Sequence, residues 1–328
     1  MRRETRLSSL LLAALLALAG TAARGAALEP TFSTNDNYGE SFTFIGDLDD
    51  GGFVLVQLSM TNIGPGSRTG ICRATVLRPG QRAWTPQNRV GGKQWRYDAA
   101  TSTLQVGDCW ARSSATGTQV EAPLDGGRVT LTYDAPLSPR SPDGSVVEVG
   151  NERYRHEVLV ATSPVKVTLQ PPKSAEETLT GGGYADHTRS TIPPAKLARR
   201  WVRFRALRGG QHLVLLAREG QDGEFGPVYF WEEGQAPRRL ESFTLNREGT
   251  KERSVWRAEF TGDDGHMAMA LRSTSILQRN APVEQLGMLA GLVRPVVGSP
   301  VTYLHRGVLE QAGKTPVQGL LEVTLEGE

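Results

Sequence analysis

Apolar and polar residues alternate along most of the chain, which is the pattern of half-buried β-strands. The run VTLTY places Val129, Leu131 and Tyr133 on one face. Comparable runs predict further strands at residues 53–60, 158–161, 165–169, 212–217, 228–231, 254–260, 267–271 and 321–325. Asp-Gly and Gly-Gly pairs, which favour tight turns, punctuate the chain between several of them. The pattern therefore predicts an all-β, antiparallel protein.

Two segments have a pattern that favours a helix. Residues 282–293 carry one apolar stripe, with Asn280 as a cap before it and Pro295 as a stop after it. Residues 194–200 are a weaker candidate. An ordered loop is the alternative for both segments.

The first and second parts of the chain repeat one order of segments. FVLVQLSMTN, CRATVLRPGQRAW and KQWRYD in the first part correspond to HLVLLAREG, GPVYFWEEGQAPRRL and SVWRAEF in the second. The repeat predicts a tandem duplication of one β domain, although β meanders also resemble each other by chance. We expect an N-terminal domain at 27–170, a polar, Gly-rich linker at 171–183 and a C-terminal domain at 184–328. A barrel of about eight strands is wide enough for one small ligand.

The first 26 residues have the features of a secretory signal peptide. Arg2, Arg3 and Arg6 precede the apolar run LLLAALLALAG, and small residues follow it. An uncleaved membrane anchor is the alternative, but the run is short for a bilayer span of about 20 residues. We therefore expect a periplasmic or secreted protein.

Charge and motif content narrow the classes of function. The 328 residues include 37 Lys and Arg against 35 Asp and Glu, and the basic excess lies in the N-terminal segment. The remainder is close to neutral, so no nucleic-acid partner is expected. None of the five histidines stands in a metal-binding spacing, and no nucleotide-binding motif occurs. We expect neither a metal nor a cofactor.

Cys72 and Cys109 are the only two cysteines of the chain. In an oxidising compartment, two cysteines of one domain usually pair. A nucleophilic or metal-binding cysteine is the alternative, but there is no CxxC and no histidine near either residue in sequence. The sequence therefore predicts a structural disulfide.

The segment GGGYADHTRS at residues 181–190 resembles the motif Gly-x-Tyr-x-Asp-His of a known family. The family joins carotenoid 1,2-hydratase (hydroxyneurosporene synthase), the AttH-like proteins and the fungal survival-factor proteins. Residues 41–57 and 303–323 are similar to its opening and closing strands. The resemblance implies two consecutive lipocalin-like β-barrel domains with short helical insertions.

The resemblance also implies site residues. In the hydratase members the motif Asp protonates an isolated double bond, which would make Asp186 the acid and Tyr184 its neighbour. The upstream His of the family corresponds to His156, while the family's nearby Trp has no counterpart, because only aliphatic residues follow. The expected ligand-binding residues are Tyr184, Asp186, His187 and Trp201.

The chemistry of the motif can also be derived from the residues themselves. In a strand, Tyr184 and Asp186 are two residues apart and point to the same face. In an apolar pocket, burial would raise the pKa of Asp186, and a neutral carboxylic acid can donate a proton. Alternatively, Asp186 has a structural role and pairs with Arg189 or an arginine of residues 199–208.

The run AKLARRWVRFRALRGG at residues 195–210 is strongly basic. As a strand, it places Trp201, Arg203 and Arg205 on one face. This face is either solvated or attracted to an anionic membrane surface.

Three functions fit these features. The leading hypothesis is an exported protein that binds a hydrophobic small molecule, such as a lipid or an isoprenoid. The alternative is a hydratase that adds water to an isolated double bond of an isoprenoid, with Asp186 as the acid. The third is a structural module of the cell envelope without a ligand.

Overall fold

The computed structural model describes residues 25–64, 66–142, 145–251, 253–284, 294 and 298–327. The predicted signal peptide lies almost entirely outside the described residues, and so does most of the helix predicted at 282–293. In the described ranges no helix is both long enough and apolar enough to cross a membrane.

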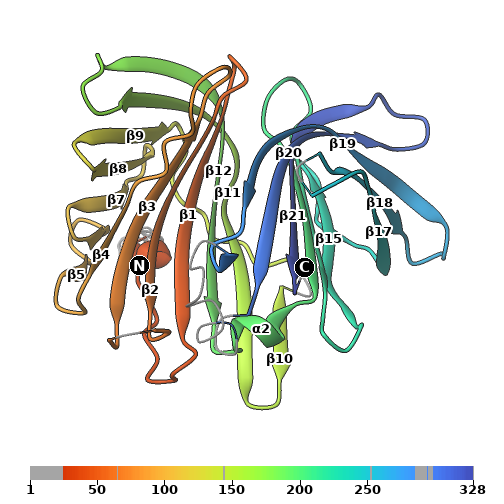
Figure 1. Ribbon diagram of the computed structural model, residues 1–328, viewed down its shortest axis with the longest axis horizontal. Helices are drawn as coiled ribbons and strands as arrows, with labels where there is room; N and C mark the ends of the chain where they lie inside the picture. Colours follow the sequence, from red (N-terminus) through yellow and green to blue (C-terminus); the bar gives the residue numbers. More distant parts are fainter. Residues whose placement is uncertain are drawn as a thin grey trace, which may run out of the picture.

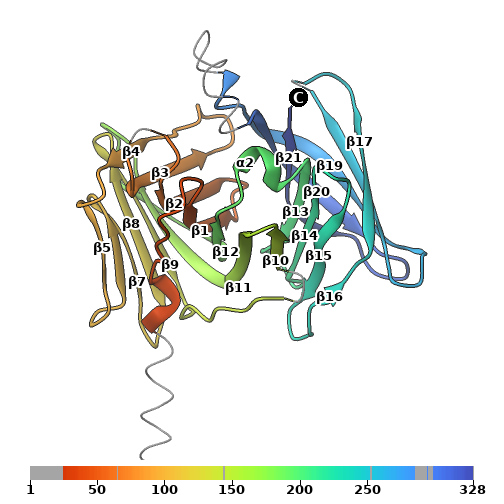
Figure 2. The same ribbon diagram turned by 90° about the horizontal axis from the view of Figure 1, so that it is seen from below.

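The first half of the fold is a sheet of 12 strands that curls into a nearly closed barrel (Figures 1 and 2). Its strand order is β4-β3-β2-β1-β12-β11-β9-β8-β7-β6-β5, and β10 pairs with β11. The strands are β1 (Gly39–Leu48), β2 (Phe53–Thr61), β3 (Thr69–Leu77), β4 (Gln87–Val90), β5 (Trp95–Asp98), β6 (Thr103–Val106), β7 (Cys109–Ser113), β8 (Thr118–Leu124), β9 (Gly127–Tyr133), β10 (Val146–Val149), β11 (Glu152–Gln170) and β12 (Glu177–Ser190).

The second half is a sheet of nine strands that forms a half-barrel beside the first. Its order is β16-β15-β14-β13-β21-β20-β19-β18-β17. The strands are β13 (Arg200–Ala206), β14 (Leu213–Glu219), β15 (Phe225–Glu232), β16 (Arg238–Arg239), β17 (Ser242–Glu248), β18 (Val255–Thr261), β19 (Met267–Asn280), β20 (Pro300–Glu310) and β21 (Val317–Glu326).

The two sheets repeat one topology. The order β4-β3-β2-β1-β12-β11-β9 of the first sheet matches β16-β15-β14-β13-β21-β20-β19 of the second. All neighbouring strands of both sheets are antiparallel. The predicted all-β fold of two lipocalin-like β domains is confirmed, and the second domain is the more open one.

The segment predicted as a linker, residues 171–183, is a turn followed by the first half of β12. Residues 177–190 pair with both β1 and β11, so the Tyr-x-Asp motif belongs to the first sheet. The glycines of this segment do not make it a flexible linker. They let its backbone pack closely against neighbouring parts of the chain. A Cβ at Gly181 would lie 2.1 Å from the carbonyl oxygen of Asp47, and one at Gly182 would lie 1.8 Å from that of Leu207.

Little helix accompanies the strands in the described ranges. A 3-10 turn, η1 (Gly25–Leu28), precedes β1, and α2 (Pro194–Leu197) joins the two sheets. The weaker of the two predicted helices is therefore present as a single turn, and Arg200 already begins β13.

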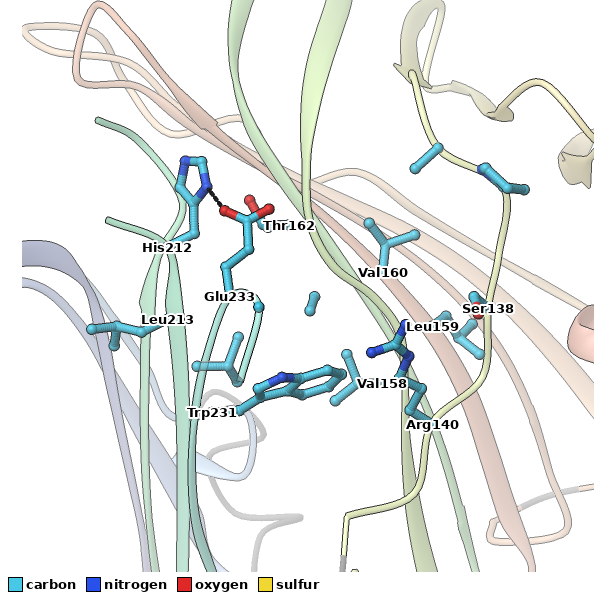
Figure 3. A pocket seen from close by; sticks show the side chains of 15 residues that line it. Ser138, Arg140, Val158, Leu159, Val160, Thr162, His212, Leu213, Trp231 and Glu233 are labelled. Carbon is cyan, nitrogen blue, oxygen red and sulfur yellow. Dashed lines mark hydrogen bonds and ion pairs between the residues drawn. The ribbon is translucent and has the colours of Figure 1, made fainter. Parts of the chain in front are cut away.

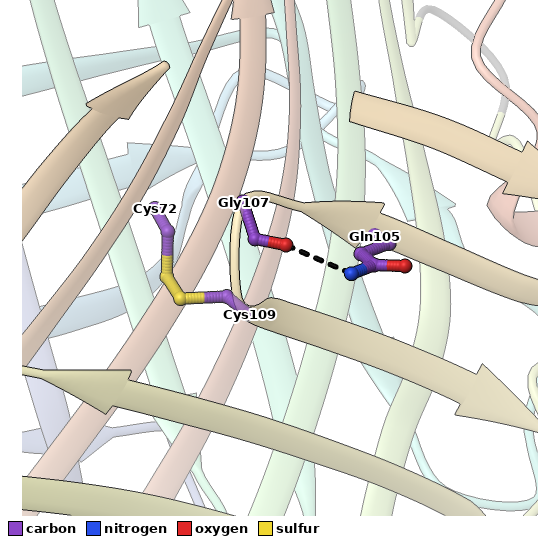
Figure 4. Close-up of a disulfide and its surroundings, with 4 residues drawn as sticks. All are labelled: Cys72, Gln105, Gly107 and Cys109. Carbon is purple, nitrogen blue, oxygen red and sulfur yellow. Dashed lines mark hydrogen bonds between the residues drawn. A yellow bond between two sulfur atoms is a disulfide. The ribbon is translucent and has the colours of Figure 1, made fainter. Parts of the chain in front are cut away.

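Cys72 of β3 and Cys109 of β7 form the predicted disulfide, which closes the barrel across two strands that are not neighbours in the sheet (Figure 4). Both cysteines are buried in the apolar core of the first half. The hairpin that carries Cys109 turns at Gly107, whose φ of +60° favours glycine.

Apolar side chains fill the inside of both halves, and a third cluster joins the halves to each other. This interface cluster contains side chains from both sheets: Ile45, Phe53, Leu77, Val158, Tyr184, Leu207, Val214, Trp231, Leu304 and Leu320. The candidate site lies within this interface.

Candidate functional site

The alternation of β12 sends the residues of the motif in two directions. Ala185 packs in the core of the first barrel, whereas Tyr184 belongs to the interface cluster. Asp186 is 5% exposed and faces the second sheet, where Arg205 of β13 meets it. The predicted common face of Tyr184 and Asp186 therefore exists, but it faces the interface between the halves rather than the inside of a barrel.

Asp186 lies within a buried polar cluster made by both halves. Its Oδ2 atom is 3.6 Å from Nε2 of His156 on β11 and 3.7 Å from Nη2 of Arg205. The hydroxyl of Tyr229 on β15 is 2.9 Å from Nδ1 of His156. The guanidinium of Arg205 lies over the ring of Tyr184, 4.6 Å from its centroid. The structure thus brings together the three predicted catalytic residues and adds Arg205 and Tyr229.

A second acidic residue occupies the equivalent place in the other half. Gly319-Leu-Leu-Glu322 of β21 matches Gly183-Tyr-Ala-Asp186 of β12 in spacing and in strand position. Arg205 bridges the two acids, because its Nη1 is 3.3 Å from Oε2 of Glu322. Arg203 also donates to Glu322, at 2.5 Å. Two arginines and two carboxylates of this cluster therefore balance in charge.

The protonation of Asp186 differs from the sequence-based expectation. Burial alone would raise its pKa, but the neighbouring His156 imidazole and the positive charges of Arg205 and Arg203 outweigh burial and lower the pKa to about 2. Asp186 is therefore an ionised carboxylate at neutral pH, not a neutral acid. Burial raises the pKa of Tyr184 and Tyr229 well above the ordinary value, so both phenols stay protonated.

Apolar clusters lie on both sides of the polar cluster along the strands. On one side is the interface cluster. On the other is a cluster that contains Tyr154, Trp201 and Tyr229. Trp201, predicted to bind the ligand, packs there against Tyr154 with ring centroids 5.5 Å apart. Trp201 therefore packs on the side of the polar cluster away from the interface cluster, and it does not line the pocket described next.

A pocket of about 330 Å³ lies between β11 of the first half and β14 and β15 of the second (Figure 3). Val158, Val214 and Trp231 give it an apolar wall, and Arg140, His212 and Glu233 are its charged or titratable residues. Val158 and Trp231 are two residues along their strands from His156 and Tyr229. The polar cluster therefore lies one strand repeat, about 7 Å, from this wall.

His187 lies outside this cluster, and its role in ligand binding stays a prediction. His187 follows Asp186 directly in β12, so its side chain points to the opposite face, into the first barrel. There it stacks on Phe42 with ring centroids 4.2 Å apart. Its Nε2 is 2.6 Å from Glu40 and its Nδ1 is 3.2 Å from Glu157. Burial disfavours a charged imidazole, but these hydrogen bonds outweigh it and raise the pKa of His187. This network connects β12 to Glu40 of β1 and Glu157 of β11.

The basic run of β13 has the predicted faces but a different environment. Val202 and Phe204 pack in the core of the second half. The opposite face, formed by Trp201, Arg203 and Arg205, lies in the interface between the halves. Arg208 continues the contact, with Nε 3.1 Å from Asp47 of the first half. The expected solvated face is therefore a buried face that joins the halves. Attraction to an anionic membrane remains a prediction for exposed arginines such as Arg199.

Sequence reasoning missed Tyr229, Trp231, Glu322 and Arg140 as residues of this region. The alternation of β15 was visible, and it places Tyr229 and Trp231 on one face. Nothing in the sequence indicated that this face meets His156. Trp231 packs in the same cluster as Val158.

Similarity to known proteins is confined to the fold. No family model and no curated protein matches the sequence. An AttH protein from Nitrosomonas europaea is 14% identical with a TM-score of 0.57, and the match covers 89% of this chain and 94% of that one. CghA, in a structure with Sch210972, is 12% identical with a TM-score of 0.59, and the match covers 89% of this chain and 89% of that one. Kievitone hydratase from Nectria haematococca is 12% identical with a TM-score of 0.54, and the match covers 92% of this chain and 94% of that one. The resemblance drawn from the YADH segment is thereby confirmed at the level of the fold.

Proposed function

We propose that the chain is an acid–base enzyme that adds water to a double bond of an apolar small molecule held between its two halves. The single observation that carries the proposal is the buried His156–Asp186–Arg205 cluster beside an apolar pocket. Isolated buried charges are costly, and a cluster of them beside a pocket is typical of catalytic sites. A hydratase among the structural neighbours supports this class of reaction.

The chemistry assigns the proton to His156 rather than to Asp186, which is already ionised. His156 donates a proton to one carbon of the double bond, and the other carbon becomes cationic. Water then bonds to that carbon, and the proton it loses returns to His156. The fixed Asp186 carboxylate stabilises the positive charge first on the imidazole and then on the substrate, and the Tyr184 or Trp231 ring contributes cation–π attraction.

Binding of a hydrophobic ligand without chemistry is the second candidate. It is favoured by the low pKa of Asp186, about 2, which removes the carboxylic acid used by the hydratases that the motif resembles. Both candidates place an apolar ligand in the same pocket. They differ in whether His156 transfers a proton.

Turnover in isotopically labelled water tests the proposal. Purified protein is incubated in H₂¹⁸O with isoprenoids that have one isolated double bond, including citronellate and methyl citronellate, and products are followed by mass spectrometry. We expect an alcohol that carries ¹⁸O. His156→Gln should abolish it, whereas Trp110→Phe, in a strand away from the interface, should leave it unchanged. Absence of labelled product with every substrate, or full turnover by a folded His156→Gln variant, would refute the enzyme and leave ligand binding.

We also propose that the protein functions outside the cytoplasm. The disulfide and the N-terminal apolar run support this location, because disulfides persist in oxidising compartments. Fusion of the first 40 residues to alkaline phosphatase, which is active only after export, tests it. An inactive, cytoplasmic fusion would contradict the proposal.

A further inference from the structure

Arg140 is fixed beside β11 at the wall of the pocket. It forms an antiparallel bridge with Val158, in which each backbone N–H donates to the other residue's carbonyl at 2.9 Å. Directly opposed residues of an antiparallel pair project to the same face. Arg140 therefore faces the second sheet together with Val158, and its side chain lines the pocket.

The guanidinium group of Arg140 lies over the ring of Trp231, 5.4 Å from its centroid. Figure 3 shows the two side chains approaching each other from opposite walls. Trp231 is 6% exposed and so offers a fixed surface. Stacking of this kind holds the plane of a guanidinium group while its N–H edge stays free to bind a ligand.

The charge of Arg140 is not neutralised by the part of the chain that the structure describes, since no carboxylate there lies within 4.0 Å of it. The other interface arginines differ: Arg203 and Arg205 pair with Glu322, and Arg208 and Arg306 pair with Asp47. The remaining charged lining residue, Glu233, is itself paired with His212 at 2.7 Å. Among the described lining residues, the exposed Arg140 is thus the one cation without a carboxylate partner, and it lies beside an apolar wall.

We propose that Arg140 binds the carboxylate of an amphipathic ligand whose apolar part occupies the wall formed by Val158, Val214 and Trp231. This inference rests on the proposed function for the identity of the site, and it names the substrate class as an unsaturated carboxylic acid. Arg binds carboxylates through two parallel hydrogen bonds, and the guanidinium group of Arg140 has the N–H donors for such a contact.

The position of Arg140 also limits the length of the substrate. Arg140, Val158 and Asp186 are directly opposed on successive strands, so they form one row across the sheet. His156, the proposed proton donor, is two residues from Val158 along β11, so one strand spacing and two residues along the strand separate its Cα atom from that of Arg140 by about 8 Å. The double bond of the substrate should therefore be separated from its carboxylate by a short saturated spacer, as in citronellate.

Calorimetric titration with citronellate and methyl citronellate tests the inference without requiring turnover. The two probes share the citronellyl chain, and the ester differs by a methyl group that removes the negative charge of the carboxylate. We expect citronellate to bind at least about tenfold more tightly, since a charge-assisted bidentate contact contributes that much. Arg140→Gln should remove the preference, and Arg140→Lys should keep part of it. Arg112→Gln is the matched control, because Arg112 lies over Trp110 at the same 5.4 Å but outside the pocket.

Each result decides the inference separately from the proposed function. Equal affinity for acid and ester, no binding of citronellate, or a preference that survives Arg140→Gln would overturn the role of Arg140. An equal loss in Arg112→Gln would do the same. Arg140-dependent binding of citronellate without its hydration would refute the enzyme alone. Hydration of citronellate that does not depend on Arg140 would refute the anchor alone.

Discussion

Replacing Asp186 by Asn tests whether this carboxylate is charged in the folded protein. The substitution keeps the size of the side chain and removes the charge that faces His156 and Arg205. The pKa of Asp186 is about 2, against an ordinary value of 3.8, which means that the folded protein favours the ionised carboxylate. That preference corresponds to about 2.5 kcal/mol, so Asp186→Asn should lower the free energy of unfolding by about 2 kcal/mol at pH 6.

The pH dependence of this loss gives the sharper test. An acid whose pKa is lowered by folding contributes its full stability above its unfolded pKa, here 3.8, and loses it as the pH falls toward 2. The difference between wild type and variant should therefore shrink to about 1 kcal/mol at pH 3. Other groups that titrate in this range, such as Glu157, are present in both proteins and cancel.

Urea unfolding of both proteins at pH 6 and pH 3, followed by circular dichroism, measures the two differences. Asp263→Asn, at an exposed residue of a turn, is the control and should change stability little at either pH. If Asp186 were instead a neutral acid, its exchange for Asn would be nearly neutral at pH 6 and independent of pH. Such a result would refute the charge assignment and restore Asp186 as the proton donor.

Other predictions concern the disulfide, the buried histidine of the first barrel and the contact between the halves. The native protein should show no titratable thiol, and two reactive thiols would contradict the bridge. In urea denaturation, the free energy of unfolding of a double Cys72→Ser, Cys109→Ser variant should be lower by about 3–4 kcal/mol. His187→Gln should cost about 3 kcal/mol at pH 6, because two carboxylates lose their partner, and the cost should diminish as the pH rises above the raised pKa of His187; a cost that grows with pH would show the opposite sign. Arg306→Gln removes the 2.6 Å contact with Asp47, which is 1% exposed, and should lower the free energy of unfolding by about 3 kcal/mol, with an unchanged value as the refuting outcome.

The elements of the fold were predictable because their signal is local. The alternation of Val129, Leu131 and Tyr133 indicates a strand with one buried face, and all three pack in the first core. The pairing of Cys72 with Cys109 followed from their number and the expected compartment. The grouping of His156 with Asp186 followed from a motif rather than from geometry.

The arrangement of the site was not predictable, since a period of two defines two faces of a strand but does not say what each face meets. Asp186 and His187 are adjacent, and one faces the second sheet while the other faces the inside of a barrel. Gly181 and Gly182 looked like a flexible junction, although they are the residues that let three strands pack closely. Arg140 stands in a segment without any pattern and acquires its place through the bridge to Val158.

The matching positions of Asp186 and Glu322 have a consequence for how the two halves depend on each other. The two acids occupy corresponding places in two copies of one topology, and a single arginine holds both. A repeated fold meeting itself face to face would be symmetric, yet here one copy supplies the imidazole and the other the guanidinium groups. A substitution in one half at this cluster therefore leaves a charge of the other half without its partner, so each half is stable only with the matching residues of the other.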